Sequence, residues 1–147
     1  MRMFGIGFIN NAGLGVMMIY TMNLSAEFNR NLQYAMFVVF VQAVPIVARI
    51  FNSLFFIQIS HESRLIFTCI LFILSYISIA LSIHSSNRED VALPCAIVGC
   101  ILHQLGRSIG EATILGYLKA LPQELICSFG TGSGVSTFFY IFIALML

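Results

Sequence analysis

Charged residues are scarce in this chain of 147 residues. Asp, Glu, Lys and Arg together make up 9% of the sequence, whereas hydrophobic residues make up 59%. A soluble domain carries about 25% charged residues, so this chain has too few to cover a surface that faces water. The formal net charge of +1 gives no strong field of either sign. The composition therefore excludes an ordinary soluble domain, and we expect no nucleic-acid partner.

Motifs for metal binding, redox chemistry and catalysis are also missing. The four cysteines form no CxxC pair, and the three histidines match no zinc-site spacing. The sequence contains no HExxH, GxSxG or paired-aspartate motif. We therefore expect no metal, no cofactor and no enzymatic activity. The cysteines are interpreted as small apolar residues in lipid or at helix contacts.

Five long apolar segments are present instead, at residues 3–22, 34–59, 65–83, 91–121 and 125–147. A bilayer core about 30 Å thick needs about 20 mostly apolar residues per helix. The segments are too long and too uniformly apolar for barrel strands, so helices are expected. The sequence predicts an all-α polytopic bundle of about five transmembrane helices, with residues 1–147 forming a single transmembrane domain. Because the last residues are apolar and no charge follows them, we also expect a truncated chain.

Two weak signals predict the orientation. Alternating loops give one side of the membrane Arg2, Arg64 and Lys119, and the other side Arg30 and Arg88. This slight excess of positive charge favours a cytosolic N-terminus. Asn23-Leu24-Ser25 is an N-glycosylation sequon in the predicted first loop, on the non-cytosolic side. Asn23 is therefore a glycosylation candidate.

The fourth segment carries the most informative polar residues. At about 100° per residue, one stripe collects Gly99, His103, Gly106, Gly110, Thr113 and Tyr117. Its glycines allow a neighbouring helix to approach closely, and the opposite face, which includes Val98 and Ile109, is expected to meet lipid. Arg107 and Glu111 lie beside the stripe, four residues apart, and can pair along the helix. Two interpretations stay open: a buried pair that only holds the bundle together, or a Glu111 that faces a water-filled path and binds a proton or substrate.

Polar residues also lie inside the first two segments. Gln42, Pro45, Arg49 and Asn52 share one face of the second. Pro45 frees a backbone carbonyl, so this turn predicts either a binding site or a simple kink. For Arg49 we favour snorkelling to the near interface. Asn10 and Asn11 in the first segment are expected to make interhelical hydrogen bonds, with substrate contact as the alternative.

The fifth segment contains a run of small residues, Gly130-Thr131-Gly132-Ser133-Gly134. It lacks the Gly-Lys-Ser/Thr ending and the preceding strand of a phosphate-binding loop. The run predicts either a helix-packing seam or a broken helix near a site. We favour the seam.

Three stretches of the sequence form a pattern that can be compared with known families. Residues 110–118, Gly-Glu-Ala-Thr-Ile-Leu-Gly-Tyr-Leu, are followed by Pro122 and the Gly-Thr-Gly of residues 130–132; Gly-Phe-Ile-Asn-Asn lies at residues 7–11, and Val44-Pro45 precedes Arg49. Together they resemble the battenin family of lysosomal and vacuolar membrane proteins, with its Gly-Leu-Gly-Glu-x-Thr-Phe-Leu run, proline and Ser-Gly-Thr-Gly stretch. Two departures stand out. Gln42 occupies a position where the family tends to have an aspartate, and the step from Pro122 to Gly-Thr-Gly is short.

The resemblance implies a multi-pass protein of the lysosomal or vacuolar membrane, with a major-facilitator-like helix bundle. It implies a role in lumenal pH balance and in movement of small solutes such as basic amino acids or glycerophosphodiesters. The alternative is a non-transporting scaffold or trafficking factor. Expected partners are the lipid bilayer, a small solute and other membrane proteins. The candidates for a substrate or proton pathway are Glu111, Arg107, His103, Asn10, Asn11, Gln42, Arg49 and Thr113. The candidates for helix packing are Gly99, Gly106, Gly110, Gly130, Gly132 and Gly134.

Overall fold

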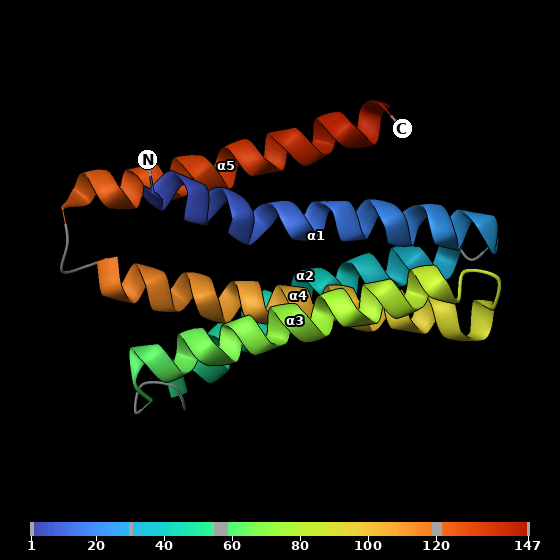
Figure 1. Ribbon diagram of the computed structural model, residues 1–147, viewed down its shortest axis with the longest axis horizontal. Helices are drawn as coiled ribbons and strands as arrows, with labels where there is room; N and C mark the ends of the chain where they lie inside the picture. Colours follow the sequence, from blue (N-terminus) through green and yellow to red (C-terminus); the bar gives the residue numbers. More distant parts are fainter. Residues whose placement is uncertain (1, 30, 55–58, 119–121, 147) are drawn as a thin grey trace.

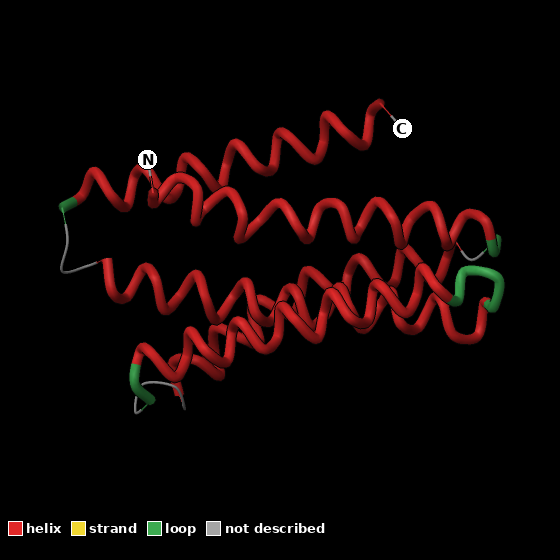
Figure 2. The backbone as a smooth tube through the Cα atoms, viewed as in Figure 1, coloured by secondary structure: helices red, strands yellow, loops and turns green. Residues whose placement is uncertain are grey.

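The computed structural model describes residues 2–29, 31–54, 59–118 and 122–146, and its regular secondary structure there is entirely helical (Figure 1 and Figure 2). The helices are α1 (Arg2–Glu27), α2 (Asn31–Leu54), α3 (His61–His84), α4 (Glu89–Leu118) and α5 (Gln123–Met146). Each lies over one of the five apolar segments. The prediction of an all-α bundle of five helices is confirmed.

Within the part of the chain that the structure describes, three helices are long and apolar enough to cross a membrane by themselves. They are α1, α3 and the part of α4 from Glu89 to Tyr117. Among the described residues of α2, the apolar stretch is Phe37–Asn52. Large apolar side chains such as Ile73 and Phe138 lie exposed on the outside of the bundle, as expected for surfaces that meet lipid. Membrane crossing by α2 and α5 stays a prediction.

The chain runs back and forth along one long axis, so α1, α3 and α5 point one way and α2 and α4 the other (Figure 1). α4 packs against α3, α1 and α2, while α1 packs most extensively against α5. α4 therefore has protein on more than one side. The expectation that its apolar face meets lipid is wrong at Ile109, which is buried.

Two predicted loops are helical in the structure. α1 continues through Asn23 to Glu27, and Ser25 of the sequon is buried. α3 begins at His61, with the Ser60 side chain accepting the Ser63 amide at 3.3 Å as an N-cap. Polar residues continue a helix beyond its apolar part whenever the backbone geometry allows. Asn23 is exposed but lies on a helix, so the loop that motivated the glycosylation prediction is absent there. Arg30 and Lys119 lie outside the described residues.

Glycines and serines join α3 to α4. A Cβ atom at Gly99 would lie 2.9 Å from the Ile79 side chain, and one at Gly110 would lie 2.9 Å from Thr68 Cγ2. At Gly106 the nearest atom would be Leu71 Cβ, at 3.2 Å. The Ser75 hydroxyl donates to the Gly99 carbonyl at 2.8 Å, across the same contact. These small residues let the two backbones approach closely, as in other membrane helix pairs. We call this contact the α3–α4 seam.

A second close contact joins α1 to α5. A Cβ atom at Gly7 would collide with the Phe129 carbonyl, and one at Gly132 would collide with the Phe4 carbonyl. At Gly130 and Gly134 a Cβ would meet nothing within 4 Å. Positions 130 and 134 point about 160° away from position 132 on a helix, so only Gly132 faces α1. Of the three glycines predicted to pack in the fifth segment, only Gly132 therefore makes a close contact with another helix.

Neither predicted helix break occurs. α5 is continuous through residues 130–134, and α2 is continuous through Pro45. The alternative of a broken helix in the fifth segment is therefore wrong, and the turn around Pro45 stays helical.

A polar cavity between four helices

A small cavity of about 60 Å³ lies where α1, α2, α4 and α5 converge. A water needs about 10–15 Å³ measured with a water-sized probe, so this space can hold a few waters or one small ion. Its polar lining comes from all four helices: Asn11, Gln42, Gln104, Arg107, Thr137 and Tyr140. Leu14, Gly15 and Met18 complete the wall. A Cβ at Gly15 would collide with the Tyr140 ring, so the glycine makes room for this side chain.

α4 supplies two polar residues of the cavity, Gln104 and Arg107. Gln104 is 1% exposed, and its Oε1 atom has no hydrogen-bond partner among the described residues. The same is true of Nε of Arg107, one turn further along. Buried polar atoms normally have a partner, either from protein or from bound solvent. These two atoms are therefore available to whatever occupies the cavity.

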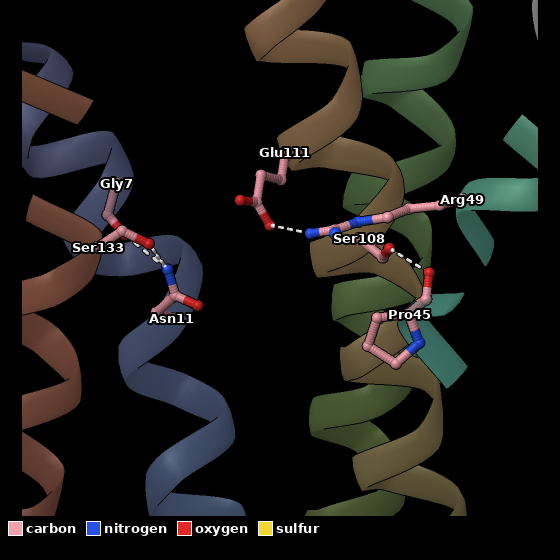
Figure 3. Close-up of polar contacts among 7 residues, drawn as sticks. All are labelled: Gly7, Asn11, Pro45, Arg49, Ser108, Glu111 and Ser133. Carbon is pink, nitrogen blue, oxygen red and sulfur yellow. Dashed lines mark hydrogen bonds and ion pairs between the residues drawn. The ribbon is translucent and has the colours of Figure 1, made fainter. Parts of the chain in front are cut away.

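Glu111 forms an ion pair with Arg49 of α2, 3.7 Å between Oε2 and Nη2 (Figure 3). The predicted partner was Arg107, on the same helix, and a projection along one helix cannot show an arginine that reaches over from a neighbour. The ion pair also directs Arg49 toward α4, whereas the sequence alone favours snorkelling of this residue to the near interface. Arg107 remains close enough to interact electrostatically with Glu111, Arg49 and Tyr140. Two guanidinium groups thus share one carboxylate.

The two asparagines of α1 point to different neighbours. The Asn11 side chain donates to the hydroxyl of Ser133 on α5 and, at 3.5 Å, to the carbonyl of Gly7 (Figure 3). Asn10 is buried, and its Oδ1 lies 3.7 Å from where a Cβ of Gly110 would be. Asn11 therefore lines the cavity while joining α1 to α5, whereas Asn10 faces α4.

The other pathway candidates lie elsewhere. His103 is 1% exposed and packs against Phe72 and Tyr76, with ring centroids 4.8 and 5.8 Å away. Thr113 is buried and donates to the Ile109 carbonyl of its own helix at 2.8 Å. His103 belongs to the side of α4 that faces α3, and neither residue lines the cavity. The structure brings together Asn11, Gln42 and Arg107 at the cavity, with Arg49 and Glu111 beside it.

Three polar residues of the cavity were not predicted from the sequence: Gln104, Thr137 and Tyr140. A signal for the first was present, since Gln104, Arg107 and Glu111 are spaced three and four apart and form a second polar stripe. Thr137 and Tyr140 are also one turn apart. Among the described residues, no group of three His, Cys, Asp or Glu side chains could hold a metal ion.

The chain is similar in sequence to a curated protein. It is 27% identical over 131 residues to battenin of Dictyostelium discoideum, a match that covers 89% of this chain and 30% of that protein. The chain thus spans about 30% of the length of this relative. No protein-family model and no solved structure matches. The match confirms the resemblance drawn from the sequence motifs, and the chain is a bundle of membrane helices that is similar in sequence to battenin.

Proposed function

We propose that this chain forms part of a solute- or proton-translocating protein of a lysosomal or vacuolar membrane, and that the polar cavity lies on the translocation pathway. One observation supports this most: polar side chains from four helices converge on one small space inside a membrane bundle. Polar and charged groups at such depth are costly, and they commonly face a cavity or one another. The similarity to battenin supports the same class of protein.

The resemblance also supplies the proposed role of the whole protein. That role is lumenal pH balance, together with movement of small solutes such as basic amino acids or glycerophosphodiesters. Within it, we assign the cavity residues Arg107 and Gln104 to ligand contact, and the pair Arg49–Glu111 to setting the charge of the site.

A scaffold or trafficking factor is the second candidate function, and one set of contacts favours it. Asn11 is bonded to Ser133, Glu111 is paired with Arg49, and the Ser108 hydroxyl donates to the Pro45 carbonyl at 3.4 Å. In a scaffold, these polar groups only hold helices together.

The test removes both members of the ion pair at once, so the net charge of the chain does not change. Arg49→Leu combined with Glu111→Leu should preserve folding, because the two side chains are 63% and 23% exposed and a pair of this kind contributes little to stability. If the pair serves translocation, the variant should reach the lysosomal or vacuolar membrane normally. The rate of solute movement, or the rate at which lumenal pH recovers after a disturbance, should then fall at least tenfold. The matched control is Arg88→Leu combined with Glu124→Leu, which removes one charge of each sign at exposed positions.

Normal delivery with normal function would favour the scaffold.

Water access gives a second, independent measurement. Glu111→Cys, in a background whose four native cysteines are changed to alanine, should react with a membrane-impermeant thiol reagent if the residue faces a water-filled path. A scaffold does not require this reaction.

A further inference from the structure

The balance of charge around the cavity is uneven. Arg107 lines it, and Arg49 and Glu111 lie within electrostatic reach of Arg107. The one carboxylate of this group is engaged by Arg49 at 3.7 Å. Two positive groups and one negative group leave an excess of one positive charge beside the cavity.

An excess charge at this depth needs compensation. Few waters fit beside Arg107, and membrane-embedded surroundings screen charge poorly. The other polar groups lining the cavity, such as Gln42, Thr137 and Tyr140, are neutral amides and hydroxyls. They can orient a bound ion by hydrogen bonds but do not neutralise the arginine.

We propose that the cavity beside Arg107 is a binding site for a small monovalent anion, of the size of chloride or a short carboxylate. Nε of Arg107 supplies a buried donor without a protein partner. Tyr140 adds a hydroxyl group from α5, on the other side of the cavity. The volume of about 60 Å³ admits one such ion and excludes a large one. This inference deepens the proposed function, because it names a ligand class for the same cavity.

The test measures binding without any movement across a membrane, so its failure is distinct from failure of the proposed function. The 147-residue chain in detergent micelles is unfolded thermally at constant ionic strength, with sodium gluconate replaced stepwise by sodium chloride or sodium acetate. A ligand that binds only the folded state raises the unfolding midpoint in a saturable way. We expect a rise of roughly 5–10 °C when the anion is at about 100 times its Kd. A response to chloride alone identifies a halide site, and a response to acetate as well identifies a site that accepts carboxylates.

Three single variants should change the strength of anion binding in different directions. Arg107→Gln should weaken anion binding at least tenfold, because it removes the principal cation. Arg49→Gln should also weaken it, because Glu111 is then free to neutralise Arg107. Glu111→Gln should strengthen it, because both cations then lack a carboxylate.

Arg88→Gln is the matched control, since it removes an exposed arginine far from the cavity lining and should leave the response unchanged. If Arg107→Gln does not fold, the opposite changes in Arg49→Gln and Glu111→Gln still decide the question. The proposal is overturned if replacing gluconate by chloride or acetate does not raise the unfolding midpoint. It is overturned as well if Arg107→Gln keeps the full rise. It is also overturned if Arg49→Gln and Glu111→Gln shift the response in the same direction.

Discussion

The two sides of α4 use polar residues in different ways. On the α3–α4 seam, hydroxyl groups are paired across glycine contacts, as in the bond from Ser75 to the Gly99 carbonyl. On the side toward α1, α2 and α5, Gln104 and Arg107 end at a cavity with polar atoms that have no partner among the described residues. His103, on the α3 side, is an exception, because both of its ring nitrogens are buried without a partner among the described residues. The paired hydroxyls of the seam contribute to stability, whereas the cavity side keeps its polar groups available. The comparison teaches that a polar residue in a membrane helix is interpreted best from the neighbour it faces.

The strongest way to break the seam is to fill a glycine. Gly99→Leu should lower the free energy of unfolding by roughly 2–3 kcal/mol, because the added side chain meets Ile79 and the Ser75 carbonyl. Thermal or denaturant unfolding in micelles measures the change. Gly116→Leu is the control on the same helix. A Cβ there would meet only the His61 ring, at 3.9 Å, so we expect a change within about 0.5 kcal/mol. Equal losses in the two variants would contradict the seam.

Removing one hydroxyl from each side sharpens the same comparison. Ser75→Ala should cost about 0.6–1.5 kcal/mol, because it deletes a fully buried bond of 2.8 Å to another helix. Thr137→Ala, at the cavity, should cost less than about 0.5 kcal/mol, since the Thr137 hydroxyl donates within its own helix, to the Ser133 carbonyl at 3.2 Å. Urea or thermal unfolding of both variants gives the two values. A larger loss for Thr137→Ala would reverse the assignment of the two sides.

The smallest effect on anion binding is expected at His103, on the side of α4 that faces α3. His103→Leu should change the free energy of unfolding by less than about 1.5 kcal/mol, because it keeps most of the volume packed against Phe72 and Tyr76. It should leave the midpoint shift with chloride or acetate unchanged. Loss of that shift, with folding intact, would place His103 at the cavity.

Long apolar segments predicted all five helices, because membrane spanning demands both length and helical hydrogen bonding. Helix ends were predicted less well. Ser60 and the residues after it looked like a loop because they are polar, yet Ser60 caps α3. Polarity marks where lipid contact ends, whereas caps and backbone geometry determine where a helix ends.

The candidate site was predicted in part. Asn11, Gln42 and Arg107 line the cavity. They could be predicted because a polar side chain inside an apolar span is costly unless it faces a cavity or another polar group. The partner of Glu111 could not be predicted, since it depends on how α2 crosses α4. Tyr140 could not be predicted either, because its ring enters through space left by Gly15 on a helix far away in sequence. Such facts arise from packing between helices, which a pattern along one helix does not contain.

The contact between Asn11 and Ser133 also has a consequence for biosynthesis. The two residues are 122 positions apart, and ribosomes add roughly 5–20 residues per second. Ser133 is thus synthesised about 6–24 s after Asn11. During that interval the amide of Asn11 and the bare glycine surface of α1 have no α5 to meet, whereas α3 and α4 can pair as soon as the short turn between them is made. The part of the bundle that closes last is therefore the wall of the cavity contributed by α5.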